Sequence, residues 1–128
     1  DAATLTGAVS VALGNVNVAL LSNNEPLADR VRAAGKAVGE RFWSLPMDAD
    51  YLTPMCGEQS DLRNISGNRN AGTITAAKFL EQFTDDIPWS HLDIAGTAWH
   101  EKPLPYAPRG ASGVAVRSLV RVAEEWSA

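Results

Sequence analysis

The chain has 128 residues, which is the size of one domain, and its 45% hydrophobic and 20% charged residues exclude a disordered segment. Its 11 basic and 15 acidic residues give a formal net charge of -4, which argues against binding to nucleic acid or to anionic membranes. The longest wholly apolar run, near residues 19–21, is far too short to cross a bilayer. A single cysteine, Cys56, excludes an internal disulfide framework and fits a reducing compartment.

The first third of the chain alternates between strand and helix patterns. Residues 1–5 resemble a short strand, and residues 8–13 predict a helix that ends at Gly14. Residues 16–21 are apolar on both faces, which is typical of a strand that is covered on both sides. Asn23-Asn24-Glu25-Pro26 supplies a cap and a first-turn proline for a second helix. The apolar stripe expected on that helix consists of Leu27, Val31, Ala34 and Val38.

The middle of the chain contains a long polar stretch between two regular elements. Residues 41–45 predict a short strand that Pro46 ends. Residues 48–70 are polar with little periodicity, so we expect a loop with a functional role. Residues 71–83 predict a helix. The side chains expected to point inward from it are Ile74, Ala77, Leu80 and Phe83.

The last third predicts one strand and one helix, separated by a second loop. Residues 89–95 form the strand, and residues 96–113 are a loop rich in proline and glycine. Ser112 is expected to cap the last helix. The predicted core stripe of that helix is Val116, Leu119, Val120 and Ala123.

Strands that are separated by helices indicate an α/β fold, with a parallel or mixed sheet and helices on both faces. Four short strands make a thin domain, and the first of them has no preceding helix to cover it. We therefore expect that part of the sheet lies outside this chain.

Three candidate motifs have better structural than catalytic interpretations. Ser112 lacks the Gly-x-Ser-x-Gly turn of a nucleophile and suits a helix cap. Cys56 has no histidine at a recognisable spacing, so a partly buried structural cysteine is favoured. Residues 67–72 have neither the Lys-Ser/Thr end of a P-loop nor a dinucleotide fingerprint.

The strongest metal-like group is His91 and Asp93, which share one face of the predicted strand, with His100 nearby in sequence. A zinc site needs three or four ligands, so we favour a hydrogen bond between His91 and Asp93 or from each to nearby backbone. Asp61 and Arg63 can form a site pair, but a salt bridge that orders the loop is the favoured interpretation. On their own, these residues make no complete catalytic set.

Four segments matter because of their order and spacing: Asp1-Ala-Ala-Thr-Leu-Thr-Gly-Ala8, then Asp61-Leu-Arg-Asn-Ile65 with Asn70-Ala-Gly-Thr-Ile-Thr-Ala-Ala77, then Trp89-Ser-His-Leu-Asp-Ile-Ala-Gly96, and Gly110-Ala-Ser-Gly-Val-Ala-Val-Arg-Ser-Leu-Val120. Together they resemble motifs of the leucyl aminopeptidase (cytosol aminopeptidase) family of dinuclear metallopeptidases. The resemblance covers essentially the whole chain.

This resemblance implies that residues 1–128 are the C-terminal portion of a larger three-layer α/β/α catalytic domain. The family's enzymes carry an N-terminal domain and two divalent metal ions, zinc or manganese. Their metal ligands, catalytic lysine and Asn-Thr-Asp-Ala-Glu-Gly-Arg signature lie upstream of the segment that matches Asp1. The resemblance therefore implies no catalytic residue and no metal ligand in this chain, and predicts that the chain alone is inactive.

The residues that the resemblance assigns to substrate binding are Thr4, Leu5, Gly7, Ile65, Ala95 and Ala98. Main-chain groups of Leu5 and Gly7 would approach the peptide and a bound bicarbonate, because a glycine after a strand lets backbone come close to a ligand. The other four would line an apolar S1 pocket for the first side chain of the substrate. Relatives can carry a larger residue such as Met at Ala98, so a deeper pocket is expected. The alternative for Ile65, Ala95 and Ala98 is ordinary packing.

The resemblance also predicts partners: peptide substrates, the upstream part of the same protein, and five further copies in a homohexamer. It predicts a cytoplasmic enzyme that releases N-terminal amino acids from peptides. The alternative is a non-catalytic, aminopeptidase-like binding or structural module. An unrelated serine or cysteine hydrolase is disfavoured, because its motifs are missing.

Overall fold

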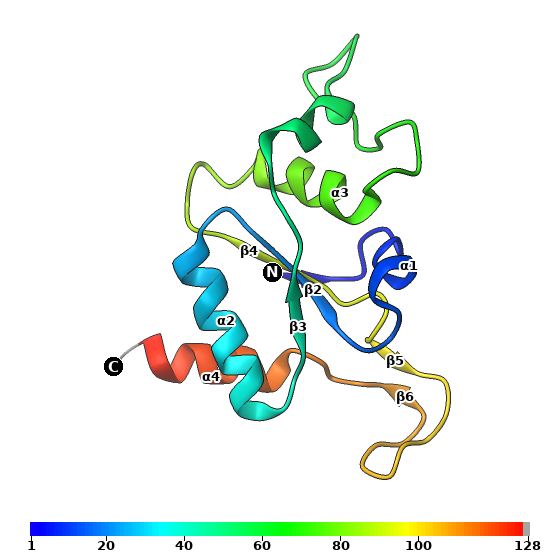
Figure 1. Ribbon diagram of the computed structural model, residues 1–128, viewed down its shortest axis with the longest axis vertical. Coiled ribbons are helices and arrows are strands. Elements are labelled where there is room, and N and C mark those ends of the chain that lie inside the picture. Colours follow the sequence, from blue (N-terminus) through cyan, green and yellow to red (C-terminus); the bar gives the residue numbers. More distant parts are fainter. Residues whose placement is uncertain (127–128) are drawn as a thin grey trace.

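A computed structural model describes residues 1–126 of the protein (Figure 1). The elements in chain order are β1 (Ala2–Ala3), α1 (Val9–Leu13), β2 (Val18–Ser22), α2 (Glu25–Val38), β3 (Phe42–Ser44), the 3-10 helix η1 (Ala49–Met55), α3 (Gly72–Glu81), β4 (Ser90–Asp93), β5 (Trp99–His100), β6 (Gly110–Ala111) and α4 (Val116–Trp126). Each predicted strand and helix is present, with bounds that differ by a few residues. Within the described residues, no helix combines the length and the apolar character that crossing a membrane demands.

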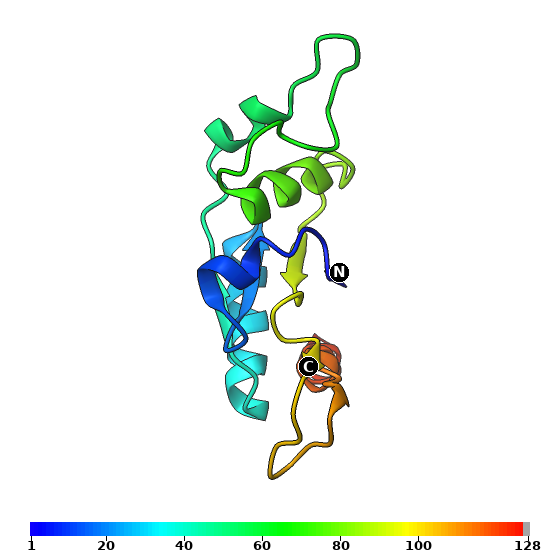
Figure 2. The same ribbon diagram turned by 90° about the vertical axis from the view of Figure 1, so that its right-hand side faces the viewer.

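Four strands form one mixed sheet in the order β1-β4-β2-β3. β1 pairs in parallel with β4, and β2 pairs in parallel with β3, but β2 runs antiparallel to β4. β5 and β6 form a separate antiparallel hairpin at one end of the elongated molecule, opposite the loop that follows η1 (Figure 2). The α/β prediction with a parallel or mixed sheet is therefore confirmed, and the sheet is the mixed type.

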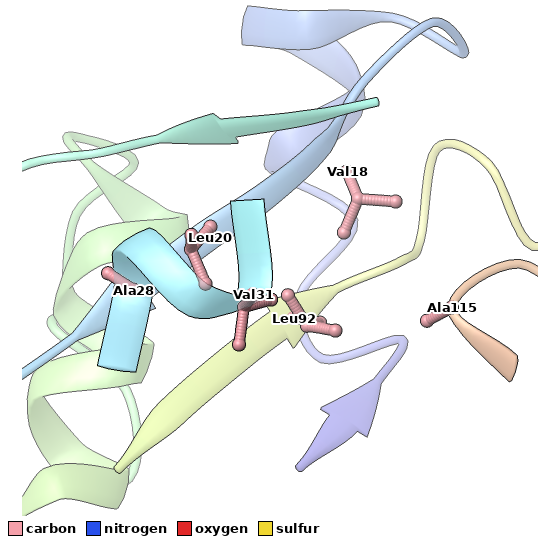
Figure 3. Close-up of a cluster of buried hydrophobic side chains, with 6 residues drawn as sticks. All are labelled: Val18, Leu20, Ala28, Val31, Leu92 and Ala115. Atoms are coloured by element: carbon pink, nitrogen blue, oxygen red, sulfur yellow. The ribbon is translucent and has the colours of Figure 1, made fainter. Parts of the chain in front are cut away.

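Helices cover both faces of the sheet. On one face, α2 and the start of α4 pack on the buried strand residues, and this cluster consists of Val18, Leu20, Ala28, Val31, Leu92 and Ala115 (Figure 3). On the other face, α1 and α3 enclose Val9, Ala19, Leu21, Ile74 and Ala77. Alternate residues of β2 enter the two clusters, which is why its sequence is apolar throughout.

The first turn of helix α2 has the local signals that the sequence predicts. The Asn24 side chain accepts a hydrogen bond from Leu27 N at 2.9 Å, and Pro26 lies in the first turn. The helix ends at Gly39, whose φ of 76° is in the left-handed region that favours glycine. Both ends of this helix are therefore specified by residues inside or next to it.

Helix α4 takes its N-terminal cap from a distant residue. The buried Glu40 carboxylate accepts from Ala115 N and Ser118 N, both at 3.1 Å, and from the Ser118 hydroxyl. A carboxylate is favourable here because the N-terminus of a helix carries partial positive charge. The predicted cap, Ser112, instead accepts from Val114 N at 3.1 Å, ahead of the helix. Glu40 holds α4 against the end of α2.

Two expectations about packing are wrong. The loop predicted over residues 48–70 contains the 3-10 helix η1, whose Met55 is buried. Phe83, expected to point inward, lies beyond the end of α3 and is exposed, although Ile74 and Ala77 are buried as predicted. The apolar periodicity of the sequence extends to Phe83, but the helix ends at Glu81 and Gln82 is its C-terminal cap.

The predicted core stripe of α4 is also wrong. All four residues of that stripe, Val116, Leu119, Val120 and Ala123, are exposed, whereas Ala115 and Ser118 are buried. The small residues face α2 because Glu40 binds the backbone there and brings the helix close. The helix therefore presents an apolar stripe to its surroundings.

Candidate functional site

The ends of two parallel strands meet at one edge of the sheet. Ala3 pairs with Asp93, and Ile94 N donates to the Ala3 carbonyl at 3.0 Å. The residues that follow β1, Thr4 and Leu5, therefore lie next to the residues that follow β4. Ligands of open α/β sheets bind outside such carboxyl ends, which makes this edge the candidate site.

The turn after β1 depends on a glycine. Gly7 has a φ of +71°, in the left-handed region where other residues are strained. Thr6 Oγ1 accepts from Ala8 N at 3.2 Å, and Gly7 O accepts from Ser10 N at 3.1 Å, so the turn leads directly into α1. The N-terminal end of α3 packs closely on it, because a Cβ at Gly72 would lie 2.9 Å from the Ala8 Cβ.

A hollow of about 400 Å³ lies between this turn, η1, the following loop and α3. Gly7 and Ile65, both predicted to bind substrate, line it together. Met55 and Val11 add apolar wall, and Arg69 adds a positive charge. The structure thus brings together two predicted residues that are separated by 58 positions in the sequence.

Ala95 lines a different hollow, of about 700 Å³, next to the β5–β6 hairpin. Trp99 and Tyr106 of the hairpin region also line it. Gly96 packs tightly there, because a Cβ at this position would lie 2.1 Å from the Gly14 carbonyl oxygen. Ala98 is half-buried, and its carbonyl accepts from Ser112 N at 2.9 Å.

The six predicted residues therefore do not share one cavity. Gly7 and Ile65 line one hollow, Ala95 lines the other, and neither hollow includes Thr4, Leu5 or Ala98. Thr4, Leu5 and Ala95 are close in space through the pairing of β1 with β4. The turn lines one of these hollows, and residues in and after α1 and after β4 line the other.

A polar network on β4 includes the buried side chains of His91 and Asp93. His91 is completely buried on β4, and its Nδ1 lies 2.8 Å from Asp1 Oδ2. Asp1 Oδ1 accepts from Trp89 Nε1 at 2.8 Å, and the indole stacks on the imidazole. Burial lowers the pKa of His91, although the charge of Asp93 opposes this shift. Asp93 Oδ1 accepts from Ala95 N at 3.1 Å.

This network corrects and extends the sequence prediction. Asp93 binds nearby backbone as expected, but His91 binds the side chain of Asp1, a residue that the sequence reasoning did not single out. Parallel pairing of β1 with β4 puts Asp1 beside His91, and no local sequence pattern predicts that pairing. His100 lies apart, on β5.

The other polar candidates also differ from expectation. Cys56 is exposed rather than partly buried, and its thiol lies 3.8 Å from the Leu52 carbonyl. Arg63 pairs with Glu58 at 3.3 Å rather than with Asp61. Within residues 1–126, no three His, Cys, Asp or Glu side chains are grouped so that they could hold a metal ion.

Comparison with known proteins identifies the family of this chain. The model of the cytosol aminopeptidase family, catalytic domain, matches residues 1–120. A probable cytosol aminopeptidase of Solibacter usitatus (strain Ellin6076) is 52% identical over 128 residues, which are all of this chain and 26% of that protein. One of Gloeobacter violaceus is 55% identical over 121 residues, which are 94% of this chain and 24% of that protein.

Solved structures of related enzymes also match the fold of this chain. A mutant of tomato leucine aminopeptidase superposes with a TM-score of 0.87 and 40% identity, over 95% of this chain and 23% of that one. The bottromycin maturation enzyme BotP, in complex with Mn, superposes with a TM-score of 0.91 and 39% identity, over 100% and 28%. The chain thus spans about a quarter of the length of the relatives it matches. It belongs to the cytosol aminopeptidase family.

Proposed function

We propose that this chain is the C-terminal segment of a metal-dependent leucyl aminopeptidase, which releases N-terminal amino acids from peptides, and that it forms the wall of the S1 pocket. One observation carries the proposal. The turn at Gly7 follows β1 at the carboxyl edge of the sheet, next to the end of β4, and it lines a hollow together with Ile65. The match of residues 1–120 to the catalytic domain supports the reaction class.

The wall residues would act by contact rather than by chemistry. Gly7 has no side chain, so its main chain can lie against a peptide or a bicarbonate ion. Ile65 lines the hollow beside Gly7, where an apolar first side chain of the substrate would be buried, and Ala95 adds apolar surface in the second hollow. The small Ala98 would leave room for a bulky one.

The two divalent ions, zinc or manganese, belong to the proposed full-length enzyme. The side chains of residues 1–126 do not fit such ions, because they contain no group of three ligands. We assign no step of the reaction to a metal held by this segment. The Mn complex of BotP supports metal dependence in a related fold.

Unpaired surfaces support a larger assembly, which we propose lies in the cytoplasm. β1 pairs on one side only, and the apolar stripe of α4 is exposed within the part of the chain that the structure describes. The upstream part of the same protein, and neighbouring copies in a homohexamer, would cover these surfaces.

The test compares the full-length protein with the isolated 128 residues. We expect the full-length protein to hydrolyse leucine-p-nitroanilide when Mn²⁺ or Zn²⁺ is added, and the isolated chain to show no turnover. Turnover by the isolated chain would contradict the assignment of the chemistry to the upstream part. A metal-loaded full-length protein without activity would instead identify a non-catalytic binding module.

A further inference from the structure

Two buried polar atoms on one face of β4 lack partners. Within residues 1–126, His91 Nε2 and Asp93 Oδ2 are both buried and neither has a hydrogen-bond partner. The two residues are two positions apart on the strand, so their side chains project from the same face. Buried polar atoms in folded proteins are nearly always satisfied, so this pair requires an explanation.

Both atoms are hydrogen-bond acceptors. The Asp1 carboxylate can only accept, so the His91 Nδ1 that lies 2.8 Å from it carries the hydrogen. In the neutral ring, Nε2 is then left with a lone pair. Asp93 already accepts from Ala95 N through Oδ1, and its Oδ2 is the second free acceptor.

The neighbouring strand offers these atoms no donor. His91 pairs with Leu21 and Asp93 pairs with Ala19 across β2, and both side chains are apolar. The indole N–H of Trp89, which stacks on His91, is already donated to Asp1. Each of the two atoms therefore needs a donor, and one small group with two donors on this face of the strand would satisfy both.

We propose that one buried water molecule donates to His91 Nε2 and to Asp93 Oδ2, and that the chain of hydrogen bonds from Trp89 through Asp1, His91, the water and Asp93 positions Ala95. A water molecule has two O–H donors and is the usual partner of buried polar groups that lack protein partners. His91 and Asp93 are then positioning residues, because they act on the pocket through the Ala95 backbone. The functional half of this inference rests on the proposed function.

The first experiment is a high-resolution crystal structure of the full-length protein. We expect one solvent peak at about 2.7–3.2 Å from both His91 Nε2 and Asp93 Oδ2. An empty site, a direct bond between the two residues, or a donor side chain from the upstream part would overturn the water. This measurement needs no activity, so it decides the inference even if the proposed function fails.

The second experiment compares two variants in the full-length enzyme. Asp93→Asn keeps an oxygen for Ala95 N and a polar group for the water, so kcat/KM for leucine-p-nitroanilide should stay within about threefold. Asp93→Leu removes both bonds, and its kcat/KM should fall about tenfold or more, mainly through a higher KM.

Substrate choice separates positioning from simple loss of structure. If Ala95 is displaced, the Asp93→Leu variant should lose more activity on leucine-p-nitroanilide than on alanine-p-nitroanilide, because the larger side chain depends more on the pocket wall. Equal losses on both substrates, or a loss in Asp93→Asn as large as in Asp93→Leu, would contradict the positioning role. Should Asp93→Leu fail to fold, the wild-type crystal structure still decides whether the water is present.

Discussion

Each face of the sheet buries one acidic side chain, and the two are satisfied to different degrees. Glu40, beside α2 and α4, accepts three hydrogen bonds from the first turn of α4. Asp93, on the opposite face, accepts one, and its second oxygen has no partner within residues 1–126. A fully satisfied buried carboxylate stabilises a fold, whereas a half-satisfied one next to a pocket marks a place where a further group can bind. We call the face covered by α2 and α4 the structural face, and the face of His91 and Asp93, where the site is proposed, the site face.

The largest expected effect is on the structural face, at Glu40. Replacing Glu40 with Leu leaves the buried donors of Ala115 and Ser118 unpaired, and we expect a loss of about 3–5 kcal/mol of unfolding free energy. Glu40→Gln keeps one acceptor oxygen and should lose less, about 1–2 kcal/mol. The shift of the urea midpoint in the full-length protein measures both. Equal losses for the two variants would show that packing, and not the cap, fixes α4.

Two glycines with similar backbone conformations test whether a position at the site differs from one in the scaffold. Gly7 at the site and Gly39 at the end of α2 have φ values of +71° and +76°, and a Cβ would meet no atom within 4 Å at either. An alanine at each position should therefore cost about 1–2 kcal/mol of stability through backbone strain alone.

Only the alanine at Gly7 should impair activity. It displaces the turn against which the substrate is proposed to lie, and a small misplacement near a reacting group can cost about 100-fold in rate. We expect kcat/KM of Gly7→Ala to fall by about tenfold or more, while Gly39→Ala stays near the wild-type value. A matched loss in both variants would mean that activity follows stability and that the turn has no special role.

Features that depend on nearby residues could be predicted from the sequence, and contacts between distant residues could not. Signals within a few residues of an element specify both ends of α2, at Asn24 and Gly39. The same holds for β2, which is buried on both faces. The Glu40 cap and the Asp1–His91 pair join residues 75 to 90 positions apart, so local patterns carried no trace of them. The stripe of α4 showed which side of that helix is apolar, but not which side packs on the sheet.

The candidate site was predictable only as a set of residues. The motif resemblance selected Gly7 and Ile65, which line one hollow, and Ala95, which lines another. Their division between two hollows depends on the path of α1 and of the loop after η1, which no motif encodes. The test of their roles is therefore the kinetics of the full-length enzyme.

A pH dependence should appear on the site face. Burial lowers the pKa of His91 below the ordinary value of 6.5, so the unfolded chain takes up a proton on acidification before the folded chain does. Above pH 6.5, His91 is mostly neutral in both states and leaves the free energy of unfolding unchanged. As the pH falls below 6.5 toward the lowered pKa, the free energy of unfolding should decrease, by at most about 1.4 kcal/mol per pH unit. His91→Gln should remove this part of the slope. An unchanged slope would mean that His91 titrates alike in both states.

The smallest expected effects compare two capping side chains. The Asn24 side chain is the partner of Leu27 N at the start of α2, so Asn24→Ala should cost about 1 kcal/mol. Ser112 binds Val114 N, but Glu40 still caps α4 when Ser112 is replaced, so Ser112→Ala should cost less, about 0.5 kcal/mol. In a Glu40→Gln background the cost of Ser112→Ala should rise, because the two acceptors serve the same helix end. Strictly additive losses in the double variant would show that Ser112 orders only the loop and that Glu40 alone caps the helix.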